Sequence, residues 1–277
     1  MYPIRQGRLY ANECTPLKAI CRVLTYPLRR KRSPALLQDV VNAAALYATE
    51  SLTIADLRLL VAPTSEACVQ SYCKSRGLEP KTLELDTKDG RAVAHWIGDP
   101  DAGTIMLFYH GGAYTMPANE TQFRLLDRPV RDLNSDQHKP SVSFLLLAYT
   151  LAPEAVYPSQ LREAAVVLAH LVQKTRRSPS KILVAGDSAG GNLALSLLSH
   201  IRHPHPGVFP IKLQCPLGGA LLISPWVSFR TDSPSYKSNV HLDVLSPLAL
   251  RRWSAMFLGQ ADTLNPEADP GPVSGDA

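Results

Sequence analysis

The sequence lacks long apolar runs. No segment reaches the roughly 18 consecutive apolar residues of a membrane-spanning helix, and residues 1–14 have no apolar core behind a basic start of the kind that directs secretion. These two absences exclude the usual transmembrane and secretory patterns. We therefore expect an intracellular protein, most simply a cytoplasmic one.

Paired cysteines are also missing. The cysteines are odd in number, and none falls in the Cys-x-x-Cys spacing of a zinc or redox site. They are Cys14, Cys21, Cys68, Cys73 and Cys215. The pattern argues against such sites and favours reduced, mostly buried thiols.

Neither sign of charge dominates the chain. Its 29 basic and 24 acidic residues leave a formal net charge of +5. The basic residues do not alternate with aromatic ones and belong to no DNA-binding motif, which argues against a nucleic-acid partner. One basic run stands out, Arg29-Arg30-Lys31-Arg32. A solvated face is the simpler interpretation of this run, and contact with an anionic membrane surface is the alternative.

The composition is that of a folded globular chain. Apolar residues make up 45% and charged residues 19%, and 277 residues suffice for one α/β domain. No internal repeat is present. The one biased segment is the tail, residues 265–277, whose Pro, Gly and Asp content predicts a loop.

Helix signals come first along the chain. Ser33 is a candidate N-cap with Pro34 at the first helical position, and an amphipathic pattern follows. Its apolar positions include Leu36, Val40, Val41 and Leu46. A second helix is expected over residues 64–76, with Gly77 as its C-cap.

Strand signals begin at Lys81. Two segments flank Lys88-Asp89-Gly90, as in an antiparallel hairpin. Four apolar runs without alternation then predict strands covered on both faces, at 104–109, 143–148, 182–185 and 220–223. Helical stretches from Ser159 and Ala189 separate the last three runs, and a final helix follows Ser246. The order predicts an α/β fold with a doubly wound, mostly parallel sheet that starts with antiparallel strands.

A serine stands at the junction of a strand and a helix. Residues 186–190 spell Gly-Asp-Ser-Ala-Gly, the G-x-S-x-G pattern that forms a nucleophile elbow in this context. The turn holds the serine in strained backbone geometry, and the two glycines keep side chains out of a tight strand-helix contact. Ser188 is thus the candidate nucleophile, with an ordinary turn as the alternative.

A second motif follows the strand at 104–109. His110-Gly111-Gly112-Ala113-Tyr114 lies where an oxyanion loop is expected, because backbone N–H groups approach a developing oxyanion only where side chains are small. The candidate donors are the N–H groups of Gly111, Gly112, Ala113 and Ala189. For His110 and Asp187 we expect local structural roles.

Together these motifs resemble the hormone-sensitive-lipase-like family of α/β hydrolases. A third segment, residues 149–164, resembles the family's Y-R-L-A-P-E block. Thr150 stands where the family usually has an arginine, and that arginine could have braced Glu154. The resemblance covers roughly residues 83–259. It implies ester hydrolysis by a Ser, Asp, His triad with no metal or organic cofactor, and an N-terminal helical cap, which we assign to residues 1–80 over a core of residues 81–277.

The expected triad base is not evident. In this fold the acid and the base follow the serine on later strands, yet only four histidines follow Ser188: His200, His203, His205 and His241. Asp232 with His241 has the right order but no strand to mount either residue. We expect the last strands of the sheet, with the acid and the base, to be absent from residues 1–277.

Two functions follow as hypotheses. The first is a serine esterase for small or medium acyl esters, impaired in this chain because a hydroxyl without its base stays un-ionised. The second is a non-catalytic binding protein, since plant gibberellin receptors resemble this family and hold a small carboxylic acid. The sequence leaves the ester and the oligomeric state open.

Overall fold

The computed structural model describes residues 21–30, 32–61, 64–135, 141–240, 242–262, 265 and 267–270. The strands are β1 (Lys81–Thr87), β2 (Gly90–Ile97), β3 (Thr104–Tyr109), β4 (Val142–Leu147), β5 (Ile182–Asp187) and β6 (Gly219–Ile223). The α-helices are α2 (Leu36–Ser51), α3 (Ile54–Val61), α4 (Ser65–Arg76), α5 (Glu120–Asn134), α6 (Ser159–Ala169), α7 (Ala189–Arg202), α8 (Pro234–Asn239) and α9 (Pro247–Leu258). Short turns of other helix types are η2 (Tyr26–Leu28), η3 (His170–Lys174) and η4 (Pro179–Lys181).

The strands form one mixed sheet. Its order is β1-β2-β4-β3-β5-β6; β2 pairs antiparallel with β1 and β4, and the other pairs are parallel. The predicted hairpin and the predicted α/β sheet with antiparallel N-terminal strands are confirmed. The carboxyl ends of β3 and β5 lie side by side, because Tyr109 pairs with Gly186. The two candidate motifs therefore leave the sheet at the same edge.

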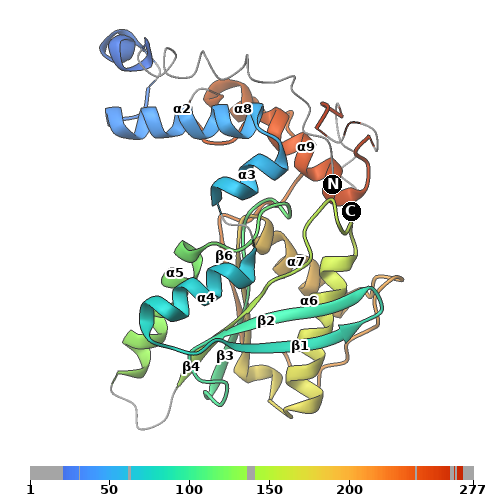
Figure 1. Cartoon of the computed structure of the whole chain (residues 1–277). Helices are drawn as coiled ribbons and strands as arrows, with labels where there is room; N and C mark the ends of the chain where they lie inside the picture. Colours follow the sequence, from blue (N-terminus) through green and yellow to red (C-terminus); the bar gives the residue numbers. More distant parts are fainter. Residues whose placement is uncertain are drawn as a thin grey trace, which may run out of the picture.

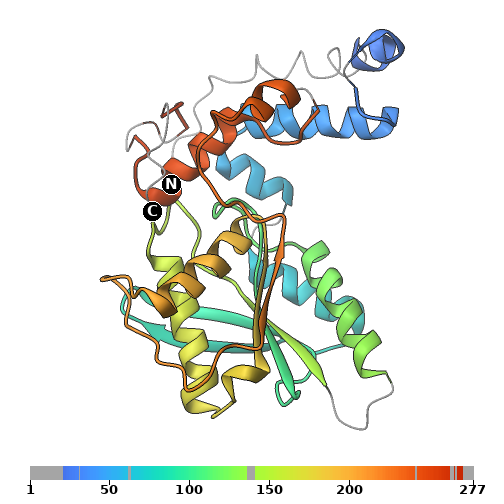
Figure 2. The same cartoon turned by 180° about the vertical axis from the view of Figure 1, so that it is seen from behind.

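Helices cover both faces of the sheet (Figures 1 and 2). Alternate residues of a strand point to opposite faces, so Leu107 packs in the core under α6 and α7 while Phe108 packs in the core under α4 and α5. This double cover explains why β3 is an unbroken apolar run. Residues of both cores are buried, and their packing against β3 fixes the position of the loop that follows this strand.

The apolar run at 220–223 does form a strand, but the prediction that both its faces are covered was wrong. Leu221 and Ile223 are exposed, and β6 pairs only with β5 among the described residues. A strand at the edge of a sheet has a neighbour on one side only. Apolar composition cannot distinguish such an edge strand from a central one.

The helix after Ser33 begins later than its N-cap signal. Its first residue is Leu36 with Ala35 in the cap position, whereas Ser33 is buried and receives hydrogen bonds from other groups. The prediction of Ser33 as N-cap was therefore wrong. The helix at 64–76 is confirmed, since Thr64 caps α4 and Gly77 ends it with φ 65°. Ser246 likewise caps α9.

Four helices lie above the carboxyl edge of the sheet: α2, α3, α8 and α9 (Figure 1). By contrast, α4 packs on the sheet beside α5. None of the described helices combines the length and the hydrophobicity needed to cross a bilayer. The described thiols are free, as predicted; Cys68 and Cys73 are buried, whereas Cys21 is exposed and Cys14 lies outside the described residues.

Glu163 on α6 is a buried carboxyl group. Its Oε2 accepts a hydrogen bond from the Thr150 N–H at 2.9 Å. Burial raises its pKa to about 7, and the hydrogen bond to Thr150 and the nearby Arg162 offset only part of that rise. Between pH 4.5, the ordinary value, and about pH 7, the folded state therefore holds a proton that the unfolded chain releases.

We predict that Glu163→Gln removes this pH dependence. Stability of the natural chain falls as the pH rises through that window, because the unfolded chain gains free energy by ionising this carboxyl group while the folded chain keeps it protonated. The variant should match the natural chain near pH 5 and exceed it by about 1–3 kcal/mol near pH 8. Urea unfolding at the two pH values measures the difference. An equal difference at both would contradict the prediction.

Candidate active site

Ser188 lies in the turn between β5 and α7. Its backbone has φ 52° and ψ −116°, a region that non-glycine residues avoid. Two hydrogen bonds hold this conformation: the Ser188 N–H donates to Ile223 O at 3.0 Å, and Ser188 O accepts from Trp226 N at 2.9 Å. The residue is half-buried and lies at the positive, N-terminal end of α7.

The glycines around Ser188 are required by close backbone contacts. A Cβ at Gly186 would lie 2.3 Å from Gly190 O, and a Cβ at Gly190 would lie 1.9 Å from Tyr109 O and 2.7 Å from His110 O. No side chain fits at either position. The elbow is therefore pressed against the start of the His110–Tyr114 loop, as the G-x-S-x-G spacing predicts.

The His110–Tyr114 loop turns sharply beside the elbow. Gly112, Ala113 and Tyr114 all have positive φ, at 121°, 54° and 62°. The Gly111 N–H donates to Asp187 Oδ1 at 2.7 Å, so this group is already engaged. Across the described part of the chain, the N–H groups of Gly112, Ala113 and Ala189 donate no hydrogen bond. Three of the four predicted donors are thus unpaired.

His110 and Asp187 have the local roles expected of them. The His110 ring is fully buried, donates from Nδ1 to Gly111 O at 2.8 Å, and stacks on Tyr149 at 4.2 Å. Burial lowers its pKa to about 4, which keeps the ring neutral at pH 7. Burial also raises the pKa of Asp187, against the hydrogen bonds from Gly111 and Gln122. Both side chains brace the loop.

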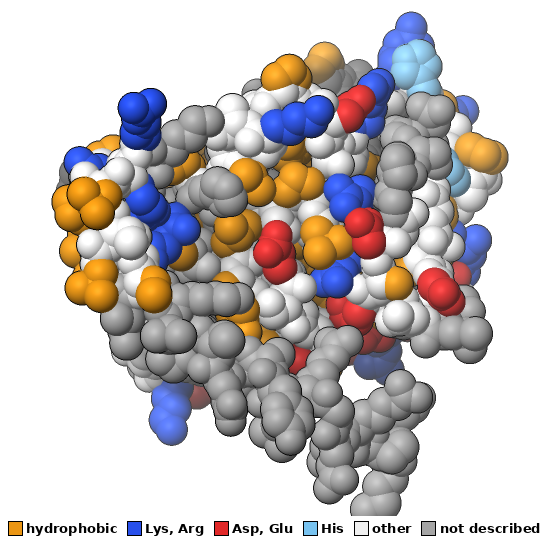
Figure 3. All heavy atoms as spheres, turned by 90° about the horizontal axis from the view of Figure 1, so that it is seen from above, with side chains coloured by type: hydrophobic (Ala, Val, Ile, Leu, Met, Phe, Trp, Pro, Cys, Tyr) orange, Lys and Arg blue, Asp and Glu red, His pale blue; other side chains and the backbone are white. Residues whose placement is uncertain are grey.

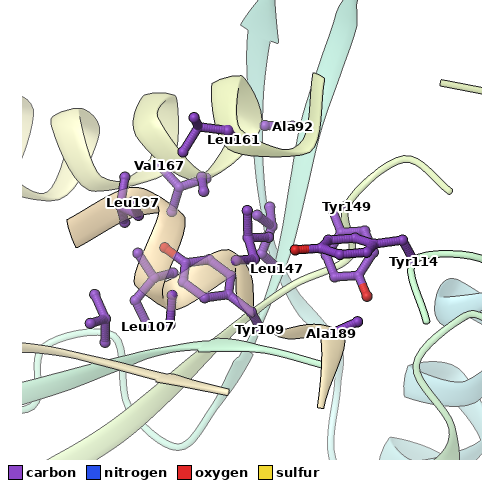
Figure 4. Packing of buried hydrophobic residues seen from close by; sticks show 14 of the residues in the cluster. Ala92, Leu107, Tyr109, Tyr114, Leu147, Tyr149, Leu161, Val167, Ala189 and Leu197 are labelled. Carbon is purple, nitrogen blue, oxygen red and sulfur yellow. The ribbon is translucent and has the colours of Figure 1, made fainter. Parts of the chain in front are cut away.

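Tyrosine side chains connect the loop to its surroundings (Figure 4). Tyr149 donates to His110 O at 2.8 Å, and Tyr114 donates to Asn192 Oδ1 at 2.7 Å. Asn192, one turn into α7, in turn donates to Trp226 O at 2.9 Å. The loop, the elbow helix and the segment after β6 therefore form one hydrogen-bonded unit.

Arg58 on α3 also supports the loops around the site, and the sequence did not predict this role. Its guanidinium donates to Thr115 O at 2.7 Å and to Ala152 O at 2.8 Å, and it forms a two-point ion pair with Glu154 at 2.6 and 2.9 Å. The family that the sequence resembles usually has an arginine at the position of Thr150. Here the cation comes from a helix 96 residues earlier in the chain.

We predict that Arg58→Met destabilises the fold by about 1–3 kcal/mol, because two loop carbonyls and one carboxylate lose a charged donor. Arg58→Lys should recover part of the loss, since it keeps the charge but not the planar fork. The matched control is Arg91→Met, which removes only an exposed pair with Glu84 and should cost less than about 1 kcal/mol. Urea unfolding that gives equal losses for the Arg58 and Arg91 methionine variants would contradict the assignment.

No described histidine serves Ser188. Within the residues that the structure describes, Ser188 Oγ makes no hydrogen bond. His200 lies roughly 18 Å along α7 at about 1.5 Å per residue and is bound to Phe209 O and His205 N. His205 Nδ1 accepts from Gly207 N. His203 is the exposed C-cap of α7.

The disfavoured Asp232 and His241 pair finds no support. Asp232 is exposed and pairs with Arg230 at 2.5 Å, and His241 lies outside the described residues. No group of three or more potential metal ligands occurs in the described ranges.

Known proteins are similar to this chain in sequence. Residues 106–275 match the model of the alpha/beta hydrolase fold family. Steryl acetyl hydrolase 1 of Saccharomyces cerevisiae is 25% identical over 180 residues, covering 62% of this chain and 39% of the yeast protein. An acetyl-hydrolase of Streptomyces hygroscopicus is 27% identical over 184 residues, covering 65% of this chain and 56% of that protein.

Solved structures agree on the fold. An esterase from the bacterial hormone-sensitive lipase family superposes with a TM-score of 0.55 at 21% identity, covering 86% of this chain and 74% of that one. An esterase/lipase from an uncultured bacterium gives 0.57 at 21% identity, with coverage of 84% and 71%. The chain spans 39% and 56% of the two curated relatives named above. The family match over most of the sheet and the elbow geometry agree: the chain belongs to the alpha/beta hydrolase fold family.

Proposed function

We propose that this site hydrolyses carboxylic esters through an acyl-enzyme on Ser188. The observation that carries the proposal is the strained backbone of Ser188 at the start of α7, together with the N–H groups of Gly112, Ala113 and Ala189, which are unpaired among the described residues. Gly111 is left out of the proposed donor set because its N–H is bound to Asp187. The names of the relatives, which are acetyl-hydrolases, support the same class of reaction.

The proposed chemistry has two halves. Ser188 Oγ attacks the ester carbonyl and loses its proton to a base, while the three N–H groups stabilise the negative charge on the former carbonyl oxygen. The alcohol leaves with a proton, and an acyl group remains on Ser188. Water then attacks the acyl group by the same route and releases the acid.

We further propose that the 277-residue chain turns over slowly. No described histidine or carboxylate contacts Ser188 Oγ, so neither half-reaction has a side-chain base in the described residues. Added imidazole should replace part of that function, because it can accept the proton from Ser188 without being attached to the chain.

We propose small or medium acyl esters as substrates, because exposed leucines of α3 lie near the elbow. Val61 on α3 and Asp187, next to Ser188, line one hollow of about 500 Å³, whose other lining residues are mostly polar. Leu59 and Leu60, adjacent to Val61, are exposed. An acyl chain of a few carbons could bury its surface there at about 25 cal/mol per Å².

Among the described residues, no base is hydrogen-bonded to the Ser188 hydroxyl. This also favours a second candidate function, a binding protein that holds a small molecule without turnover. A fluorophosphonate probe distinguishes the two. For the hydrolase, we expect a covalent adduct on the peptide containing Ser188, formed slowly and accelerated by imidazole. If the peptide stays unmodified at every imidazole concentration, the hydrolase proposal fails and the binding protein is favoured.

A further inference from the structure

Helix α2 has its apolar side outward. At 3.6 residues per turn, Leu37, Val41 and Ala44 lie along one stripe, and all three are exposed, Leu37 by 76% and Val41 by 50%. The opposite side carries Asp39 and Asn42, and both are buried. The amphipathic pattern predicted here is present, and its apolar positions Leu36 and Val41 are exposed.

Polar contacts hold the helix in this orientation. Asp39 is fully buried and accepts hydrogen bonds from Arg22, from Arg29 and from the Ser33 N–H. Burial alone would raise its pKa, but these donors lower it to about 2. Asn42 donates to Leu242 O at 2.6 Å, which ties α2 to the segment before α9. Turning the apolar stripe inward would break all of these bonds.

The segment before α2 adds to the same surface. Arg22 and Arg29 bind Asp39, so residues 21–29 pack against the first turn of the helix. Leu24 and Leu28 in that segment are 70% and 82% exposed. The run that follows continues with Arg30 and Arg32, both of which are exposed.

Charge is distributed unevenly along the chain. Residues 1–49 contain eight Lys and Arg against two acidic residues, a net charge of +6, whereas the whole chain carries +5. Figure 3, which looks down on the helical layer, shows hydrophobic and basic side chains gathered at the end where α2 begins. Among the described residues, the exposed Arg30 and Arg32 thus stand close in sequence to the exposed Leu24, Leu28 and Leu37.

We propose that residues 21–41 form a docking surface for an anionic phospholipid bilayer. Leu24, Leu28, Leu37 and Val41 would enter the interface between headgroups and acyl chains, and Arg30 and Arg32 would meet the lipid phosphates. Nucleic acid would interact favourably with the arginines but would not bury the exposed aliphatic side chains. A bilayer does both, and water-insoluble esters collect in it.

The test is sedimentation of the full chain with vesicles. We expect binding to vesicles of phosphatidylcholine with phosphatidylserine, weak binding to phosphatidylcholine alone, and a loss of binding as salt is raised. Leu24→Ser with Leu28→Ser and Leu37→Ser should weaken binding at least tenfold. Arg30→Glu should weaken it at least fivefold.

Control variants make the same kinds of substitution on another surface, with two leucine changes in place of three. Leu125→Ser with Leu133→Ser, and separately Arg128→Glu, alter exposed residues of α5 away from this surface and should bind as the natural chain does. The proposal is overturned if the two vesicle types bind equally, if the α2-surface variants bind as the controls do, or if a DNA duplex competes fully with the vesicles. This readout does not depend on Ser188, so the proposed function can fail while the docking surface stands.

Discussion

Gly190→Ala is expected to destabilise the fold by about 3 kcal/mol or more. The added Cβ would lie 1.9 Å from Tyr109 O, a contact that no rotamer change can relieve because both partners are backbone. Either the start of the His110 loop or the first turn of α7 must move. Both are fully buried here, so the movement would also disturb the packing of Ala189.

Chemical unfolding in urea measures this loss. The matched control is Gly219→Ala on β6, where the nearest atom to an added Cβ is a Leu183 methyl at the ordinary distance of 3.7 Å. The control should stay within about 1 kcal/mol of the natural chain. If the two variants unfold at the same urea concentration, the close contact between elbow and loop is not present in solution.

Ser188→Ala is expected to remove at least about 99% of the imidazole-supported hydrolysis of p-nitrophenyl acetate by this chain. The loss follows because Ser188 is the proposed nucleophile, and serine nucleophiles contribute several orders of magnitude when a base acts with them. Ser199→Ala changes an exposed serine on the same helix and should leave the rate unchanged.

The background reaction of imidazole with the ester is subtracted with a protein-free blank. A Ser188→Ala chain that keeps more than about half of the natural rate would place the reaction elsewhere on the protein. Brisk, Ser188-dependent turnover without imidazole would instead contradict the proposal that the chain turns over slowly.

The sequence predicts the elbow and the central strands well because the residues that identify them lie close together in the sequence. The G-x-S-x-G turn depends on the close approach of Gly186 to Gly190, four residues later, and the glycine at position 186 reports that approach directly. The unbroken apolar runs of β3 and β5 likewise report burial on both faces. Short-range spacing and local composition are enough in both cases.

The missed features depend on partners that are distant in sequence. Arg58 reaches Glu154 across 96 residues, and nothing around Arg58 marks it as a donor to two loops. The orientation of α2, with its apolar side outward, depends on the ion pairs of Arg22 and Arg29 with Asp39. These ion pairs stabilise the orientation by more than the exposure of Leu37 costs. The engagement of Gly111 by Asp187 also joins residues 76 apart. Periodicity carries no information on such pairings.

The most direct measurement is the location of an acetyl group on the protein. The chain is treated with p-nitrophenyl acetate and imidazole, quenched in acid, and analysed by peptide mass spectrometry. We predict one acetyl group on the peptide containing Ser188, and none on that peptide in Ser188→Ala. An unmodified Ser188 in the natural chain, with acetyl groups found only on lysines, would contradict an acyl-enzyme at this elbow.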